Sequence, residues 1–195
     1  GARIDVNALI GNAQGHPLFI DELVAFALAD PRSESVHRGL SALVGARIAK
    51  LDPESQRVLE LVSVAGMPTA QEIIARAAGS SDFQRHVSAL RAARLVRTSG
   101  GRVSDNIEPY HDRIQRPVLE HLTGELQRAH HRQLAVAHEG ADPPNYETLV
   151  RHYRACDEPA KAAHYAASAG DLAHSALAFD RAAQFYRQAV ELCPS

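Results

Sequence analysis

Tryptophan is absent from this 195-residue sequence, aromatic residues make up only 5% of it, and it has two cysteines and one methionine. Cys156 and Cys193 lie far apart and no C-x-x-C pair occurs, so the sequence predicts neither a zinc site nor a disulfide framework. No stretch approaches the roughly 18 apolar residues of a membrane-spanning helix, and no secretory signal opens the chain. We therefore expect a cytoplasmic protein without membrane contact.

The phosphate-binding loop G-x-x-x-x-G-K-[ST] is also missing, as is an acidic strand end that would hold magnesium. The glycine-containing stretch at residues 11–15 (GNAQG) lacks both the lysine and the hydroxyl residue of such a loop. No Ser-His-Asp or Cys-His set is indicated either. We therefore expect no catalytic residues, no resident metal and no unaided ATP hydrolysis.

The composition is typical of a mainly α protein. Hydrophobic residues make up 45% of the chain, enough for one good core or two small ones, and alanine, leucine, arginine and glutamate favour helices. The net charge of −2 argues against a dedicated nucleic-acid-binding protein. The chain starts without methionine and stops just after a helical pattern, which we interpret as a piece of a longer protein.

Residues 1–50 are predicted to form a helical segment of two helices, at 17–29 and 36–51, separated at Asp30-Pro31. The first follows a Gly15-His16-Pro17 turn, with Pro17 near the first helical position. This turn has two interpretations. It is either a helix start packed on its neighbour, or a site where the Pro17 ring and the helix-start amides meet a ligand.

Residues 51–124 have the element order of a winged helix, with three short helices followed by a small β-hairpin. The first helix starts at Asp52-Pro53, and capping-box patterns at Thr69–Glu72 and Ser81–Gln84 predict the starts of the next two. Strands are predicted at 95–98 and 102–104. A further helix is expected after His111, with Asp112 as N-cap and Pro117 bending or delaying it.

Residues 125–195 are rich in alanine and tyrosine and are predicted to form an α-solenoid of the tetratricopeptide type. The expected helices cover 125–138, 146–155, 159–170 and 171–192, with a linker at 140–145 and a turn at Gly170-Asp171. Tyr153, Tyr165 and Tyr186 are expected to fill the solenoid core, and both cysteines to be buried by packing.

Four stretches together suggest a family: Gly15–Leu23 (GHPLFIDEL), Leu90–Val96 (LRAARLV), Tyr110–Ile114 (YHDRI) and Ala169–Asp171 (AGD). Their order resembles the C-terminal half of bacterial STAND-type, AAA-like signalling ATPases. In these proteins a helical lid, a winged helix and tetratricopeptide-like repeats follow the nucleotide-binding domain. The resemblance covers nearly the whole chain.

The resemblance implies that Pro17 packs on the adenine of a bound nucleotide and that His111 reaches the diphosphate in an ADP-locked state. ADP or ATP would then bind only in the full-length parent, together with the upstream nucleotide-binding domain, and not to this fragment alone. Pro117 departs from the family pattern, because it falls where the family continues an unbroken helix.

The sequence therefore predicts a regulatory, non-catalytic fragment of a signalling ATPase and transcriptional regulator. It would couple nucleotide state to oligomerisation and to binding of protein partners or a sensor ligand by the helical repeats. One alternative is a winged helix that binds DNA through Arg91 and Arg94, together with Arg85 and His86 on the third helix and Arg97 just after it. We do not favour it, because carboxylates leave the segment without strong positive charge. Another alternative is a plain helical-repeat adaptor.

The histidines His121, His130, His131 and His138 raise the question of a metal site, since His131 and His138 share a helix face. No pair of histidines at i, i+4 with an acidic ligand nearby supports it. We interpret them as a polar helix face.

Overall fold

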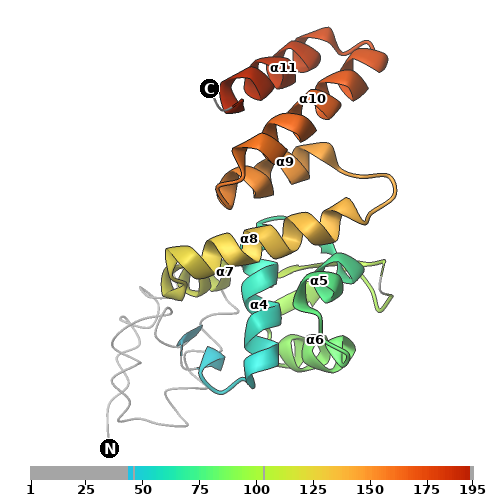
Figure 1. Ribbon diagram of the computed structural model, residues 1–195. Helices are drawn as coiled ribbons and strands as arrows, with labels where there is room; N and C mark the ends of the chain where they lie inside the picture. Colours follow the sequence, from blue (N-terminus) through green and yellow to red (C-terminus); the bar gives the residue numbers. More distant parts are fainter. Residues whose placement is uncertain (1–43, 46, 103, 194–195) are drawn as a thin grey trace, which may run out of the picture.

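The computed structural model describes residues 44–45, 47–102 and 104–193. The predicted helical segment 1–50 therefore lies outside the described residues except for its last few positions, and so does Pro17. The described part is mainly helical, as the composition predicts, and falls into a winged helix and a stack of repeat-like helices (Figure 1). None of its helices is long and apolar enough to cross a membrane.

The winged helix follows the predicted order of elements. The elements are α4 (Pro53–Ala65), β1 (Thr69–Ala70), α5 (Gln71–Ala78), α6 (Phe83–Ala92), β2 (Val96–Thr98) and β3 (Asn106–Pro109). The strands form an antiparallel sheet in the order β1-β3-β2, with Thr69 opposite Ile107 and Thr98 opposite the same residue on its other side. The hairpin predicted from sequence thus gains a third strand from the segment between α4 and α5.

The start of α4 is as predicted, but both predicted capping boxes are wrong. Asp52 caps α4 by accepting a hydrogen bond from Ser55 N (3.0 Å). Thr69, by contrast, lies in β1 and its hydroxyl donates to the Met67 carbonyl, so α5 starts after Ala70 without a side-chain cap. Asp82 occupies the N-cap position of α6, again without a capping bond. Pairing of Thr69 with β3 is a tertiary effect that overrides the local signal.

The second strand of the hairpin lies later in the chain than predicted. Asp105 Oδ2 accepts from Arg102 N (2.6 Å), and Gln71 Nε2 donates to the Arg102 carbonyl (3.0 Å). These bonds engage Arg102 and Asp105 outside the sheet, and strand pairing starts only at Asn106.

Two helices follow the wing, α7 (Asp112–His121) and α8 (Gly124–Glu139). The N-cap of α7 is His111 rather than the predicted Asp112, because the His111 backbone is extended and its Nδ1 accepts from Arg113 N (3.2 Å). Pro117 does not delay the helix, which starts before it and continues to His121. Its ring is buried.

The core of the winged helix consists of large aliphatic side chains that are completely buried. Leu59 and Leu61 of α4 belong to one buried cluster with residues of α5, α6, β2, β3, α7 and α8. The remaining fully buried large residues of this core are Ile74, Leu90, Leu95, Ile107 and Leu134. Burial of each stabilises the fold by roughly 1.5–3 kcal/mol relative to exposure.

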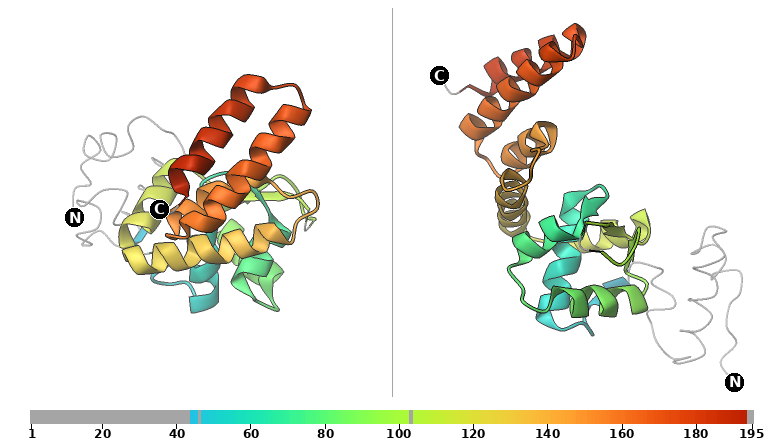
Figure 2. Two further views of the ribbon diagram at one scale, coloured as in Figure 1. Left: turned by 45° about the horizontal axis from the view of Figure 1, so that its top comes forward. Right: turned by 90° about the vertical axis from the view of Figure 1, so that its right-hand side faces the viewer.

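The repeat region contains α9 (Tyr146–Ala155), α10 (Pro159–Ser175) and α11 (Phe179–Leu192), which lead away from the winged helix in succession (Figure 2). The bounds of α9 agree with the prediction, whereas the turn predicted at Gly170-Asp171 is wrong. Helix α10 continues through it, and the turn comes at Leu177, whose φ is 59°. Gly170 instead lies against the Tyr186 ring, where a Cβ would be 2.6 Å from Cε1.

The expectations for cysteines and tyrosines are met in part. Cys156 and Tyr153 are buried, as expected. Cys193 is exposed, because it follows the end of α11. Tyr186 is 38% exposed and Tyr165 is only half-buried, since few helices pack on this end of the stack.

Candidate functional site

His111, the predicted nucleotide contact, lies beside a hollow of about 310 Å³ at the base of the wing. The end of α4, the paired strands β2 and β3 and the start of α7 surround the hollow. Since Nδ1 of His111 accepts a backbone hydrogen bond, a neutral ring carries its proton on Nε2. His111 is therefore both a structural N-cap and a side chain whose second nitrogen is a donor.

The charges around this hollow limit what it can bind by itself. Arg97 lines it, but its Nε donates to Glu108 Oε1 (3.0 Å). The carboxylates of Glu108 and Asp112 line it as well. An anion such as a diphosphate would meet two carboxylates and one arginine that is already paired, so further positive groups from elsewhere would be needed to hold it.

The predicted DNA contacts, Arg91 and Arg94, lie at the exposed end of α6 and do not line the hollow beside His111. Arg94 follows the helix with φ of 54°. His86, assigned to the same basic face from sequence, is instead buried, with Nδ1 3.0 Å from Ser55 Oγ and 3.4 Å from Asp52 Oδ1 of the α4 cap. Residues 51–124 carry as many carboxylates as arginines, which gives this unit no net positive charge.

Helix α8 contributes to two cores at once, a feature that the sequence did not predict. On one side Leu134 and Ala137 belong to the core of the winged helix, and His130 Nε2 donates to Glu60 Oε2 of α4 (2.9 Å). On the other side Ala135 packs with Leu149, Tyr153, Cys156 and Ala162 of the repeat region. A displacement of α8 would therefore change the packing of both cores.

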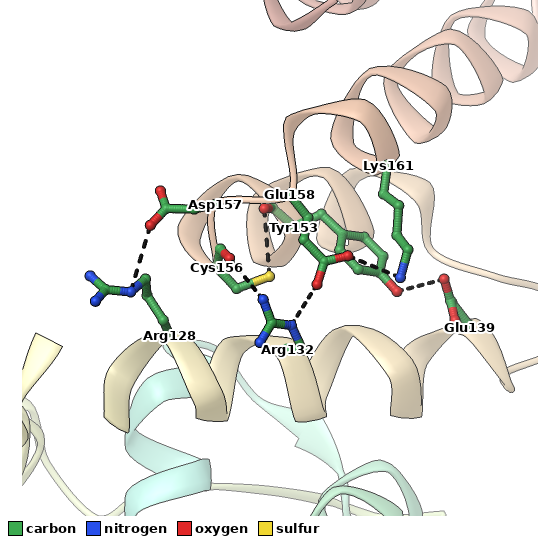
Figure 3. Close-up of polar contacts among 8 residues, drawn as sticks. All are labelled: Arg128, Arg132, Glu139, Tyr153, Cys156, Asp157, Glu158 and Lys161. Carbon is green, nitrogen blue, oxygen red and sulfur yellow. Dashed lines mark hydrogen bonds and ion pairs between the residues drawn. The ribbon is translucent and has the colours of Figure 1, made fainter. Parts of the chain in front are cut away.

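Polar contacts line the side of α8 that faces the repeats (Figure 3). Arg132 Nε donates to Glu158 Oε1 (2.5 Å), and Tyr153 donates its hydroxyl proton to Glu139 Oε1 (2.6 Å). Glu158 also accepts from Lys161 (3.0 Å), and its pKa is lowered by the hydrogen bonds from Arg132 and Lys161. The pKa of Tyr153 is raised by burial and by its hydrogen bond to Glu139. These contacts fix how the first repeat helices sit on α8.

Three histidines, His131 and His138 of α8 and His152 of α9, form a cluster between the two helices. His131 Nδ1 lies 2.8 Å from His152 Nδ1, and the rings of His138 and His152 stack with centroids 5.7 Å apart. The interpretation of these α8 histidines as a polar helix face is therefore wrong. Sequence periodicity placed His131 and His138 on one face, but it could not show that His152 lies opposite them.

No metal site results from this arrangement, since no group of three or more histidines, cysteines or carboxylates placed to hold an ion occurs among the described residues. Another concave surface is an apolar groove of about 500 Å³, lined by residues 143–145, the start of α9, α10 and α11. Leu172 and Phe185 line it, with Arg181 paired to Glu147 at 2.6 Å. An apolar groove with a neutralised ion pair suits a protein segment better than a charged small molecule.

No known protein family, curated protein or solved structure matches this chain. Its function has to be inferred from its own residues and from the resemblance described above.

Proposed function

We propose that this chain is the regulatory part of a STAND-type signalling ATPase, in which the winged helix responds to nucleotide state and the helical repeats to a protein partner or sensor ligand. Helix α8 would connect the two. The observation that carries the proposal is the sharing of α8, whose Leu134 and Ala137 pack in one core while Ala135 packs in the other. Because packed cores favour discrete arrangements, a partner on the repeats that shifts α8 would change the winged helix as well.

Nucleotide would be bound jointly with an upstream ATPase core. The hollow beside His111 is also lined by carboxylates that disfavour an anion, so this chain by itself is expected to bind ADP weakly or not at all. In the parent protein, His111 Nε2 would donate to a phosphate oxygen, and Pro17 would cover the base. This contact would exist in the ADP-bound closed state only, which is the difference in affinity that a switch requires.

The test uses the protein extended upstream of Gly1 to include the preceding domain. It would be purified and denatured, and the released nucleotide quantified. His111→Ala removes both the donor and the N-cap, whereas His111→Asn keeps a good N-cap but its shorter side chain cannot reach as far. We expect wild type to retain ADP and both variants to lose most of it, roughly tenfold or more.

Three other results would change the assignment. Loss of ADP in His111→Ala alone would mean that His111 acts only as a cap. Equal retention in all three proteins would leave the ATPase intact and remove His111 from the nucleotide site. Absence of nucleotide from every protein would favour the helical-repeat adaptor, for which the apolar groove of about 500 Å³ is the binding surface.

A further inference from the structure

The histidine cluster lies where the winged helix meets the repeats. His131 and His138 come from α8, which packs in the core of the winged helix, and His152 comes from α9, the first helix of the repeat stack. His152 is completely buried, and the other two rings are half-buried. The cluster thus forms part of the contact that holds α9 on α8.

The hydrogen bonds within the cluster have a fixed direction. Arg151 Nη2 lies 3.4 Å from His152 Nε2, and since arginine can only donate, His152 Nε2 must be the acceptor. A neutral His152 then carries its proton on Nδ1 and donates it to His131 Nδ1 (2.8 Å), so that His131 carries its own proton on Nε2. Only neutral rings keep both bonds, because one added proton makes both atoms of one contact donors, either the two Nδ1 atoms or His152 Nε2 and the arginine nitrogen.

The surrounding charges also disfavour protons on these rings. His131 is affected by Arg151 and His130, His138 by Arg151 and Arg76, and no carboxylate contacts the cluster among the described residues. Glu60, the nearby acid of α4, is bonded to His130 instead. His138 Nε2 and Arg151 Nε are buried without hydrogen-bond partners in the described part of the chain. A charged imidazolium here would face a guanidinium with no counter-ion.

We propose that the histidine cluster is a proton-sensitive latch: its neutral rings hold the repeat helices against α8, and proton uptake on acidification releases α9 from α8. The released state would keep the helices themselves, because none of these histidines belongs to the hydrophobic core of the winged helix or to α10 and α11. Opening would therefore separate the two units that α8 connects. This proposal does not depend on nucleotide binding.

The pKa values agree with the direction of the effect. Burial and the neighbouring Arg151 lower the pKa of His131 and of His138 to about 4, and that of His152 to about 2. A released ring titrates near its ordinary value of about 6.5. Since the closed-state pKa is depressed, stability of the closed state is present above about pH 6.5 and falls as the pH drops below that value.

The size of the effect follows from the same linkage. A ring that stays neutral when closed and titrates near 6.5 when open favours opening roughly thirtyfold at about pH 5. Partial exposure of His131 and His138 reduces this, and we expect about tenfold per ring. Glu139 and Glu158 of the same interface have lowered pKa values and stay ionised at about pH 5, so they do not contribute.

The experiment measures fluorescence resonance energy transfer between two dyes attached to the 195-residue chain. One dye is placed on the exposed native Cys193 after α11 and the other on Ser88→Cys, exposed on α6, with Cys156 replaced by alanine. We expect the transfer efficiency to change reversibly between about pH 7.5 and about pH 5 while the helical circular dichroism is retained. A triple His131→Gln, His138→Gln, His152→Gln variant is expected to lose this response.

A matched control changes two exposed histidines of α10, His164→Gln and His174→Gln, and should respond to pH as wild type does. A pH-independent distance in wild type, or an unchanged response in the triple variant, would overturn the proposal. If the triple variant does not fold, nitrogen NMR of the wild-type histidines decides instead. The latch requires the proton of His152 on Nδ1 and that of His131 on Nε2 at neutral pH, and the opposite tautomers would refute it.

Discussion

The winged helix and the α10–α11 hairpin bury their apolar side chains in opposite ways. The winged helix closes around large aliphatic residues such as Leu59, Leu61 and Ile74, none of which is accessible to solvent. The hairpin brings its two helices together through alanines and Gly170, and its large apolar residues Leu172, Phe179 and Val190 remain 60%, 58% and 75% exposed. Small residues thus make the contact, and large ones face outward.

The winged helix thus supplies its own core, whereas the α10–α11 hairpin leaves an apolar face uncovered. Close approach of two helices over small residues buries little area per residue, so it contributes less than a core of leucines does. An exposed face of this kind is typical of a surface that other helices or partners contact. We therefore expect the winged helix to dominate the stability of the described chain, and the hairpin to be its least stable part.

The largest expected effect comes from truncating the winged-helix core. Leu59→Ala should lower the free energy of unfolding by about 3 kcal/mol, because it leaves a cavity around a side chain that is fully buried. Leu172→Ala on α10 makes the same chemical change at an exposed position and should cost less than about 0.5 kcal/mol. Urea denaturation of both variants measures the two losses in free energy of unfolding. Equal losses would show that the two regions are packed alike.

Gly170→Ala tests whether the hairpin depends on close approach. The added Cβ would lie 2.6 Å from Tyr186 Cε1, so the ring must move and strain its hydrogen bond to Asp171 Oδ1 (2.8 Å). We expect a net loss of about 1 kcal/mol, although alanine favours helix over glycine by a similar amount. In a Tyr186→Ala background the clash is gone, and the same substitution should stabilise α10. A gain in both backgrounds would contradict the role given to Gly170.

The smallest expected effect is a gain in the turn between the two helices. Leu177 adopts a φ of 59°, a left-handed conformation that leucine disfavours, and it is 74% exposed. Leu177→Asn should therefore raise the free energy of unfolding by about 0.5 kcal/mol, because asparagine tolerates this region. Leu172→Asn, at an exposed helical position, should instead cost a few tenths of a kcal/mol. Thermal unfolding of the pair would detect the opposite signs.

Local sequence signals succeeded where they agreed with the tertiary contacts. Asp52-Pro53 predicted the start of α4, and Tyr146 to Ala155 marked α9, because caps and apolar periodicity act within a few residues. The same type of signal failed at Thr69, which pairs with Ile107 on a distant strand. It failed again at Gly170-Asp171, where glycine signals a helix crossing rather than a turn. Both failures involve partners far away in the sequence.

The candidate sites divide in the same way. The sequence singled out His111 after the wing as a candidate nucleotide contact. Its role as the N-cap of α7 was not predicted, because it depends on the extended backbone conformation of His111. Pro17 lies outside the described residues, and its role stays a prediction. The sequence did not predict the histidine cluster, because His131 and His138 on α8 form it only together with His152 and Arg151 on α9.

By itself, the amino-acid sequence determined the helical class, the winged-helix order of elements and the change to small-residue helix pairs after the linker at 140–145. These follow from composition and from periodicity, which are properties of neighbouring residues. Only the tertiary structure decided that α8 is shared between two cores, that Gly170 passes under Tyr186, and that three histidines meet beside one arginine. Such contacts join residues distant in the chain, and their energies depend on burial that no local pattern specifies.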